Sequence, residues 1–251
     1  MQLSWPSATI PPELAADEAH VWAVPLAADA AAWDALWHIL ATDERARADA
    51  FYFDDPRRRF VVARGALRLL LGRYLDVRPE NIAITIENGG KPRLASEHAA
   101  TDLRFNLSHS GELALIAVAL GGEVGVDVEQ LREVSDLERI AQRYFHPTEV
   151  EDMLNTASNQ KIAAFLRCWT AKEAVLKAHG TGIAERLDTF RVPQSAGFEG
   201  WIDLSEMPRS AQDSQCWLMR LTPCDGYVAA VASMGRERRV QCFAFAPNPT
   251  S

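Results

Sequence analysis

Residues 162 to 177 follow a helical pattern of apolar side chains that has a glutamate inside its apolar stripe. At about 100° per residue, Glu173 projects near the middle of the stripe, and Lys172 and Lys177 fall on its two flanks. A buried carboxylate is costly unless a positive group meets it, so either a cation pairs with Glu173 or a metal ion binds it. The Gly180 and Gly182 pair favours a C-terminal stop. The stripe consists of Ile162, Phe165, Leu166, Trp169 and Leu176.

A second carboxylate pattern lies in the sequence Gly125-Val126-Asp127-Val128-Glu129. Valines at 124, 126 and 128 alternate with the other residues, which predicts a strand with one apolar face. Asp127 and Glu129 therefore point the same way, roughly 6–7 Å apart at Cα. This spacing suits a hard cation such as Mg²⁺, which takes further ligands from water and substrate phosphates. Together with Glu173 and the two flanking lysines, the pattern predicts a phosphate-handling site and does not name its substrate.

The charge and cysteine content narrow the range of functions. A net charge of −8 over 251 residues argues against a general nucleic-acid binder, which is normally basic. The four cysteines show neither CxxC pairing nor zinc-ligand spacing, so we expect reduced thiols in a cytoplasmic protein. The first residues lack the pattern of a secretory signal, and the longest apolar run, 113–120, is too short to span a bilayer. We therefore expect neither a membrane nor a nucleic-acid partner.

Periodicity predicts helices and strands in both halves of the chain. A capping box is expected at Ser135 and Glu138. The segment 226–232 loosely echoes 111–117, which favours an α+β fold of two similar lobes with the carboxylates near their junction. Helices are predicted over 27–42, 43–51, 57–74 and 135–145, from His146, and through Glu173. Strands are predicted at 20–25, 81–87, 112–120, 124–129, 189–192, 200–204, 216–221, 226–232 and 240–246, and the lobes at 1–122 and 123–251.

The predicted helix over 57–74 carries six arginines. For most of them, spacing alone favours solvated side chains or partners of acidic neighbours. Arg64 and Arg68 are four residues apart and share one face of the helix. One or two of the six remain candidates for a phosphate contact. They are Arg57, Arg58, Arg59, Arg64, Arg68 and Arg73.

Two short motifs are weak when each is taken alone. Residues 88–92, Asn-Gly-Gly-Lys-Pro, predict a hairpin turn with an exposed Lys91 and lack the spacing of a Walker loop. Ser108 and His109 do not form a nucleophile–base pair by adjacency, because neighbouring strand side chains point to opposite faces. Such a Ser-His pair is more typical of a structural or anion-binding position.

Taken together, four motifs make the chain resemble the Sfp-type 4′-phosphopantetheinyl transferases. Each motif is short, but their order and separation are specific, and they cover roughly residues 40–182. After residue 190 no motif matches, although the predicted strands suit the second lobe of that family. The motifs are Gly90-Lys91-Pro92, Phe105-Asn106-Leu107-Ser108-His109-Ser110, Gly125-Val126-Asp127-Val128-Glu129, and Trp169-Thr170-Ala171-Lys172-Glu173 with Lys177.

The resemblance implies a monomeric α+β fold with two lobes related by a pseudo-twofold axis and coenzyme A bound between them. It implies an enzyme of the holo-acyl-carrier-protein synthase type. Such an enzyme transfers 4′-phosphopantetheine from coenzyme A to a serine of an apo acyl carrier protein or peptidyl carrier domain and releases adenosine 3′,5′-bisphosphate. The implied metal is Mg²⁺, with Mn²⁺ as the alternative. Carriers of fatty-acid, polyketide and nonribosomal-peptide synthesis all remain candidate acceptors.

The resemblance also implies roles for individual residues. Asp127, Glu129 and Glu173 would hold the metal on the pyrophosphate, and Glu173 or a water on the metal would take the proton from the acceptor serine. Lys177 would contact the pyrophosphate or the transferred phosphate, with Lys172 beside it. Arg47 departs from the lysines that the family often has there, and Glu44 stands where a second lysine is common. The 3′-phosphate would fall to His109, Arg59 and Arg47, and the adenosine end to Lys91 and Ser108.

Two other functions stay open at this point. One is a non-catalytic module that binds coenzyme A or a carrier protein; loss of a metal carboxylate or of Lys177 would have favoured it, and neither is lost. The other is a Mg²⁺-dependent hydrolase of nucleotide pyrophosphates, which would consume coenzyme A without a carrier. Glu149 is interpreted as a surface helix residue, with a supporting or general-base role as the alternative. Trp169 is expected to pack in the core.

Overall fold

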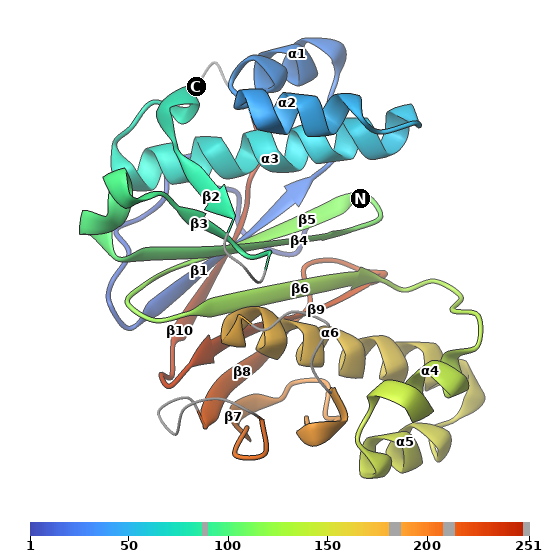
Figure 1. The fold of residues 1–251 in the computed structure, drawn as a ribbon. Helices are drawn as coiled ribbons and strands as arrows, with labels where there is room; N and C mark the ends of the chain where they lie inside the picture. The colour runs from blue at the N-terminus through green and yellow to red at the C-terminus, as the bar shows by residue number, and fades with distance from the viewer. Residues whose placement is uncertain (87–89, 181–186, 208–213, 248–251) are drawn as a thin grey trace.

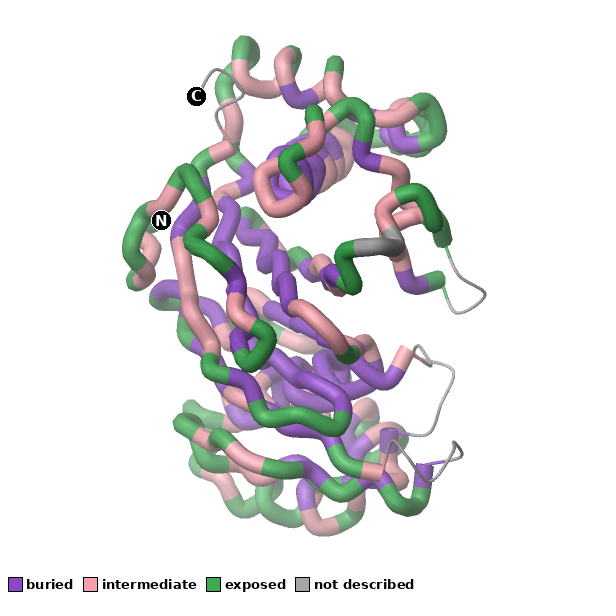
Figure 2. Tube along the Cα trace, turned by 90° about the vertical axis from the view of Figure 1, so that its left-hand side faces the viewer, coloured by how far each residue is buried: buried purple, intermediate pink, exposed green. Residues whose placement is uncertain are grey.

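Two four-stranded sheets pack face to face, and helices cover the outer face of each sheet (Figure 1). The computed structural model describes residues 1–86, 90–180, 187–207 and 214–247. One face of each sheet turns its apolar residues toward the other sheet, and the opposite face turns them toward the helices. Seen from the side, buried residues concentrate in these inner layers (Figure 2). The layers confirm the predicted α+β fold class.

The first sheet is built mainly from the first half of the chain. In spatial order its strands are β10 (Arg239–Ala244), β1 (Glu18–Pro25), β5 (Leu113–Leu120) and β4 (Leu103–Ser110). The helices on its outer side are α1 (Ala30–His38), α2 (Thr42–Asp49) and α3 (Asp54–Leu75). Trp22, Leu67 and Ile116 are fully buried between the sheet and α3. The predicted helices and strands of this half are present; α1 is shorter than predicted, whereas α3 and β1 extend beyond their predicted ends.

Short elements connect α3 to β4. They are η1 (Pro79–Asn81), β2 (Ile84–Ile86), β3 (Pro92–Leu94) and η2 (Ser96–Thr101), of which β2 and β3 pair as an antiparallel hairpin. The strand predicted from residue 81 begins only at Ile84, because the preceding residues form a 3₁₀ turn. Asn88 and Gly89 of the predicted hairpin turn lie outside the described residues.

The second sheet is built from the second half of the chain. In spatial order its strands are β6 (Val124–Gln130), β9 (Tyr227–Met234), β8 (Gln215–Leu221) and β7 (Glu199–Asp203). The helices are α4 (Leu137–Tyr144), α5 (Pro147–Leu154) and α6 (Lys161–His179), with 3₁₀ turns η3 (Ser158–Gln160) and η4 (Leu187–Thr189). α6 packs along the outer face, where Phe165 and Val175 lie in one core with Leu218.

The two lobes place corresponding strands in the same order. In the first lobe, β1 lies beside β5, and β5 lies beside β4. In the second lobe, β6 lies beside β9, and β9 lies beside β8. The echo predicted between residues 111–117 and 226–232 falls on β5 and β9, the two strands that occupy the same place. This order agrees with the pseudo-twofold arrangement that the resemblance implied.

β10 departs from the predicted lobe boundary. It pairs in parallel with β1, with Arg239 opposite Glu18, so it completes the first sheet although the sequence prediction assigned it to the second lobe. The pattern of residues 239–244 predicts a strand but does not say which sheet it joins. β5 takes one edge of β1, and β10 covers the other edge.

Two predicted local features are wrong. Residues 189–192 do not form a strand: η4 ends at Thr189, and Phe190 and Val192 pack in the core without a strand partner. Ser135 does not cap α4, because the helix begins after Asp136, whose φ of 56° is left-handed and whose side chain makes no cap bond.

Other expectations fall partly outside the described chain. Gly180 ends α6 in the left-handed conformation with a φ of 83°, as predicted, whereas Gly182 and the predicted tail beyond residue 247 are not among the described residues. All four cysteines are free thiols, as expected. None of the described helices combines the length and apolar character needed to span a bilayer.

Candidate active site

The active-site candidates meet where α6 crosses β6, and this crossing depends on Gly125. A Cβ at Gly125 would lie 2.2 Å from the carbonyl oxygen of Ala174 and 2.3 Å from the amide nitrogen of Ala178. The strand and helix backbones therefore touch at this point, which no larger residue permits. Because Asp127 lies on the same face of β6 as Gly125, the contact brings its carboxylate to Glu173 and Lys177 of α6.

Asp127 forms the centre of the site. Lys177 donates from Nζ to Oδ1 of Asp127 at 2.6 Å and to the hydroxyl of Ser108 at 3.0 Å. Ser108 in turn donates to the same Oδ1 at 2.7 Å. Ser108, predicted at the adenosine end, thus lies beside the metal-ligand candidates instead. Oδ1 of Asp127 therefore accepts from two donors, and Oδ2 remains available to a further ligand.

Two buried carboxylate oxygens in this site have no hydrogen-bond partner among the residues that the structure describes. They are Oδ2 of Asp127 and Oε1 of Glu173. Burial raises the pKa of Glu173 to about 7, and the negative charges of Asp127 and Glu129 add to that shift, which Lys177 opposes. Burial also raises the pKa of Glu129, although Ser110 donates to its carboxylate at 2.6 Å. The three carboxylates together carry more negative charge than Lys177 neutralises.

This donor set fits a hard divalent cation that binds together with phosphate. Among the described residues, no three His, Cys, Asp or Glu side chains are arranged to hold a metal by themselves. Mg²⁺ characteristically takes only one or two protein carboxylates and completes its shell with water and substrate phosphates. The unpartnered oxygens of Asp127 and Glu173 are the observation that supports such an ion here.

Polar residues of β4 link the two sheets, and the sequence prediction missed two of them. The side-chain oxygen of Asn106 accepts from the amide of Val126 at 2.9 Å, and the hydroxyl of Ser110 binds Glu129. Together with Ser108 they occupy every second position of β4, so they face β6 together. The alternation in Phe105 to Ser110 is the sequence signal for this face.

Lys172 does not lie beside the site, contrary to the prediction. Its side chain is fully buried, and its ammonium pairs with Glu149 at 2.8 Å. It also donates to the carbonyl oxygens of Leu187 and Phe190 at 2.8 and 2.6 Å. Two residues adjacent on a helix point about 100° apart, so Lys172 faces the core while Glu173 faces β6. Lys172 anchors the chain after α6.

Glu149 is likewise a buried residue and not a surface one. Its carboxylate accepts from the amides of Val192 at 2.6 Å and His146 at 2.9 Å, in addition to Lys172. Because its carboxylate is fully buried and already accepts from three donors, it is not placed to take a proton from a substrate. The default interpretation of Glu149 as exposed was wrong, because the sequence does not show that α5 packs against α6.

Lys91 is buried and not exposed, which corrects the hairpin-turn expectation. Its ammonium contacts Glu123 at 2.8 Å and the carbonyl oxygens of Val124 and Lys177 at 3.1 and 2.6 Å. Lys91 therefore ties β3 of the first lobe to β6 and α6 of the second. This arrangement gives no support to a contact with adenosine.

The arginines divide into structural and accessible groups. Arg64 and Arg68 both bind the buried Glu44, at 3.1 and 2.5 Å, which confirms their shared face and their acidic partner. Arg47 lies over the ring of Phe60 at 5.5 Å. Arg59 pairs with Glu112 in the turn after β4.

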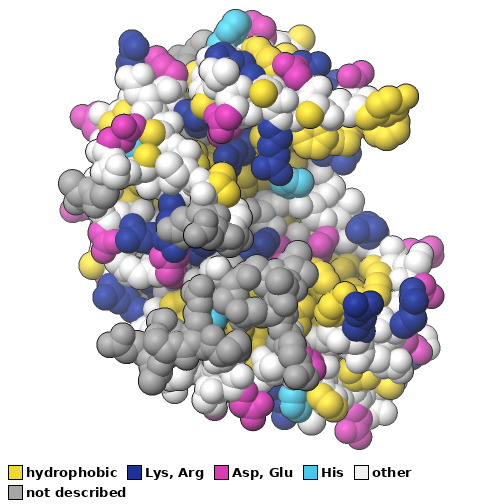
Figure 3. Space-filling view, in the orientation of Figure 1, with side chains coloured by type: hydrophobic (Ala, Val, Ile, Leu, Met, Phe, Trp, Pro, Cys, Tyr) yellow, Lys and Arg dark blue, Asp and Glu magenta, His cyan; other side chains and the backbone are white. Residues whose placement is uncertain are grey.

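Arg59 also belongs to a line of basic groups that reaches the carboxylates. The pKa of His109 is lowered, first by desolvation and then by the positive charges of Lys177 and Arg59. The hollow between the lobes gathers basic, acidic and histidine side chains (Figure 3). Arg59, His109 and Lys177 thus offer positive charge or hydrogen bonds along one path from the first lobe to the second.

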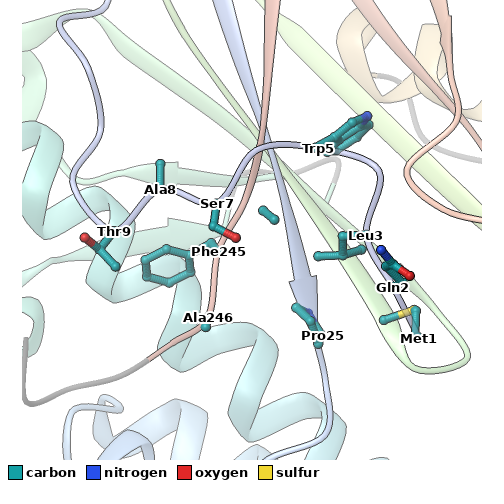
Figure 4. Close-up of a pocket in the computed structure, with 11 residues that line it drawn as sticks. Met1, Gln2, Leu3, Trp5, Ser7, Ala8, Thr9, Pro25, Phe245 and Ala246 are labelled. Atoms are coloured by element: carbon teal, nitrogen blue, oxygen red, sulfur yellow. The ribbon is translucent and has the colours of Figure 1, made fainter.

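A cavity elsewhere lacks the chemistry of a catalytic site. It measures about 490 Å³ and is lined by residues near both ends of the described chain, among them Leu3, Trp5 and Phe245 (Figure 4). No described residue of its lining carries an acidic, basic or imidazole side chain. Its size therefore does not outweigh the charged junction of β6 and α6.

Known proteins are similar in sequence to both lobes of this chain. Residues 123–232 match the profile described as the 4′-phosphopantetheinyl transferase superfamily, and residues 26–120 match that described as 4′-phosphopantetheinyl transferase, N-terminal. The chain is 42% identical over 230 residues to the 4′-phosphopantetheinyl transferase HetI of Nostoc sp., across 90% of this chain and 92% of that protein. It is 27% identical over 194 residues to the 4′-phosphopantetheinyl transferase Sfp of Bacillus subtilis, across 77% and 82%. A putative 4′-phosphopantetheinyl transferase of Synechocystis sp. is 35% identical over 150 residues, across 60% and 61%.

Proposed function

This chain belongs to the 4′-phosphopantetheinyl transferase superfamily, and from that premise we propose that the junction of β6 and α6 transfers 4′-phosphopantetheine from coenzyme A to a serine of an apo carrier protein. The observation that carries this assignment is the pair of buried, unpartnered oxygens on Asp127 and Glu173 beside Lys177. These oxygens place negative charge in the site, and a bound cation together with substrate phosphate would satisfy it.

The reaction breaks one phosphorus–oxygen bond and forms another. The serine oxygen attacks the phosphorus that bears pantetheine, and the bridging oxygen leaves with adenosine 3′,5′-bisphosphate. We propose Glu173 as the group that accepts the serine proton; burial raises the pKa of its metal-free carboxylate to about 7. Glu149 is a poorer candidate for this role, because it is fully buried and its carboxylate already accepts from three donors.

Asp127, Glu129 and Glu173 would hold Mg²⁺, or Mn²⁺, together with phosphate oxygens. When bound, the ion neutralises charge on the pyrophosphate, which is the main demand of phosphoryl transfer. Lys177 contributes a second positive charge on the same side, since its ammonium already lies against Asp127 and its side chain is 27% exposed. In the first lobe, Arg59 and His109 would bind the 3′-phosphate, with Arg47 assisting.

We assign a different role to each lobe. We assign residues 1–122 mainly to binding the nucleotide end and residues 123–251 to the metal and the transfer, with β10 as a structural part of the first lobe. A single chain contains both sets of residues, so we propose a monomer. An acyl carrier protein, as in holo-acyl-carrier-protein synthases, is the proposed acceptor class, with peptidyl carriers as the alternative.

The test is the intact mass of a purified apo carrier protein after incubation with this protein, coenzyme A and Mg²⁺, against a control with chelator. A metal-dependent gain of one phosphopantetheine group is expected, and Glu173→Gln or Asp127→Ala should abolish it without unfolding the protein. Binding of coenzyme A without any gain across several carriers would indicate a binding module. Breakdown of coenzyme A without carrier modification would indicate a hydrolase.

A further inference from the structure

The ion pair between Arg59 and Glu112 lies at the nucleotide end of the proposed site. Arg59 is in the second turn of α3, and Glu112 is in the turn between β4 and β5. Their side chains are 35% and 50% exposed, so both remain open to solvent and to a ligand. A partly exposed pair of this kind is weak and can be exchanged for a stronger one.

The surroundings of this pair are large enough for a phosphate group. A cavity of about 210 Å³ is lined by Arg59 and Glu112 together with Arg58, Asp55 and residues 26–28. Arg58 donates to the carbonyl oxygen of Ala28 at 3.2 Å, which holds one wall in place. The charged side chains that line the cavity are the guanidinium groups of Arg58 and Arg59 and the carboxylates of Asp55 and Glu112.

The turn that carries Glu112 is fixed by the second lobe. The amide of Glu112 donates to the hydroxyl of Tyr227 at 3.1 Å. Gly111 has a φ of 55°, and a Cβ there would lie 2.4 Å from the side-chain oxygen of Gln130. The backbone at Glu112 is therefore held in place, and its carboxylate stays within reach of Arg59 by rotation of the side chain alone.

We propose that Glu112 is an internal counter-ligand of Arg59 that weakens the binding of a 3′-phosphate. This inference rests on the proposed function, in which Arg59 binds the 3′-phosphate of coenzyme A. A phosphate monoester carries about −1.5 to −2 charges near neutral pH and forms bidentate bonds with arginine, so it displaces the carboxylate. Each ligand with a 3′-phosphate must first break the pair, so its apparent Kd is the intrinsic Kd divided by the fraction of protein in which Arg59 is available.

The consequence concerns both ends of the reaction. Coenzyme A and the released adenosine 3′,5′-bisphosphate carry the same 3′-phosphate, so the counter-ligand weakens both. Weaker binding of the product promotes its departure, and product release limits the turnover of many enzymes. Glu112 thus determines how readily the nucleotide leaves without touching the reacting phosphorus.

The test is calorimetric titration of wild type and Glu112→Gln with coenzyme A, adenosine 3′,5′-bisphosphate and 3′-dephospho-coenzyme A. Glutamine keeps the size and polarity of the side chain and removes its charge. We expect the Kd of the first two ligands to fall about threefold to fivefold, and that of the dephospho compound to stay within about twofold. In an Arg59→Ala background, Glu112→Gln should change none of the three by more than about twofold.

Asp49→Asn is the matched control, because Asp49 forms a comparable pair with the neighbouring Arg57 at 2.6 Å and its loss changes net charge equally. Its affinities should equal those of wild type. Weaker binding of coenzyme A by Glu112→Gln would show that Glu112 orients Arg59 and would overturn the proposal. Equal tightening of all three ligands, or the same effect in Asp49→Asn, would also overturn it. A wild-type protein that binds no coenzyme A would instead contradict the proposed function itself.

Discussion

Ser108 of the first sheet donates its hydroxyl to Oδ1 of Asp127 in the second sheet at 2.7 Å. β4 and β6 are the facing edges of two different sheets, and side chains instead of backbone ladders join them here. The position of the central carboxylate is therefore set by both lobes. A change in one lobe therefore reaches the proposed chemistry in the other through this bond and through those of Asn106 and Ser110.

Ser108→Ala should reduce both transfer and stability. It removes a donor from a buried carboxylate, which costs about 1–3 kcal/mol of the free energy of unfolding. It also frees Asp127 and Lys177 to shift, and small misplacements in a site cost about tenfold to a hundredfold in rate. Urea denaturation and kcat/KM for carrier modification measure the two effects. Thr156→Ala, which removes an exposed 2.9 Å bond to the carbonyl of Asp152, serves as the control and should leave kcat/KM unchanged.

Gly125→Ala should separate α6 from β6. The added methyl group has no room against the backbone of Ala174 and Ala178, so we expect a loss of about 2–4 kcal/mol in the free energy of unfolding. Gly197→Ala is the matched control, because nothing lies within 4 Å of a Cβ at that exposed glycine. If the urea midpoints of the two variants were equal, the backbone contact would not be the determinant of the crossing.

Lys172→Met should mainly reduce stability, whereas Lys177→Met should mainly reduce turnover. Loss of Lys172 leaves Glu149 buried without a counter-charge, which costs about 3–5 kcal/mol of stability. Loss of Lys177, whose side chain is 27% exposed, should cost only about 1 kcal/mol but reduce kcat about 10²–10³-fold. Denaturation and turnover of both variants measure this contrast. A stable, slow Lys172→Met would return Lys172 to the active site.

The stability of the metal-free protein should fall between about pH 5 and pH 7 because of Glu173. Its folded pKa is about 7, above its ordinary value of 4.5, so the folded state binds a proton that the unfolded state has lost. Stability therefore declines as pH rises through this window, by an amount on the order of 3 kcal/mol at most. Urea midpoints in chelator at pH 5 and pH 8 measure the decline. Glu173→Gln should be flatter across the range and more stable than wild type at pH 8; an unchanged slope would remove Glu173 as its source.

The sequence predicted the elements of the site better than their surroundings. Alternation placed Asp127 and Glu129 on one face of β6, and helical spacing placed Glu173 on α6, because these are local geometric relations. The surroundings of Lys172 and Lys177 were harder to predict. Both flank the same stripe, yet one is buried against Glu149 and the other meets Asp127.

Long-range packing explains the remaining errors. Lys91 was expected in solvent because a Gly-Gly-Lys-Pro turn is usually exposed, whereas the packed lobes surround its ammonium. β10 was assigned to the wrong lobe because a strand's pattern carries no record of its partner. In both cases the deciding contacts join residues far apart in the chain.

The pairing of β10 with β1 in the first sheet has a consequence for folding during synthesis. A ribosome completes Glu18 early and Arg239 near the end, yet the two lie opposite each other in one parallel pair. Until then, one edge of β1 offers unpaired amides and carbonyls to any extended segment nearby. The first sheet is therefore completed only after residues 239–244 are made, and a chain interrupted before residue 239 leaves this edge of β1 uncovered.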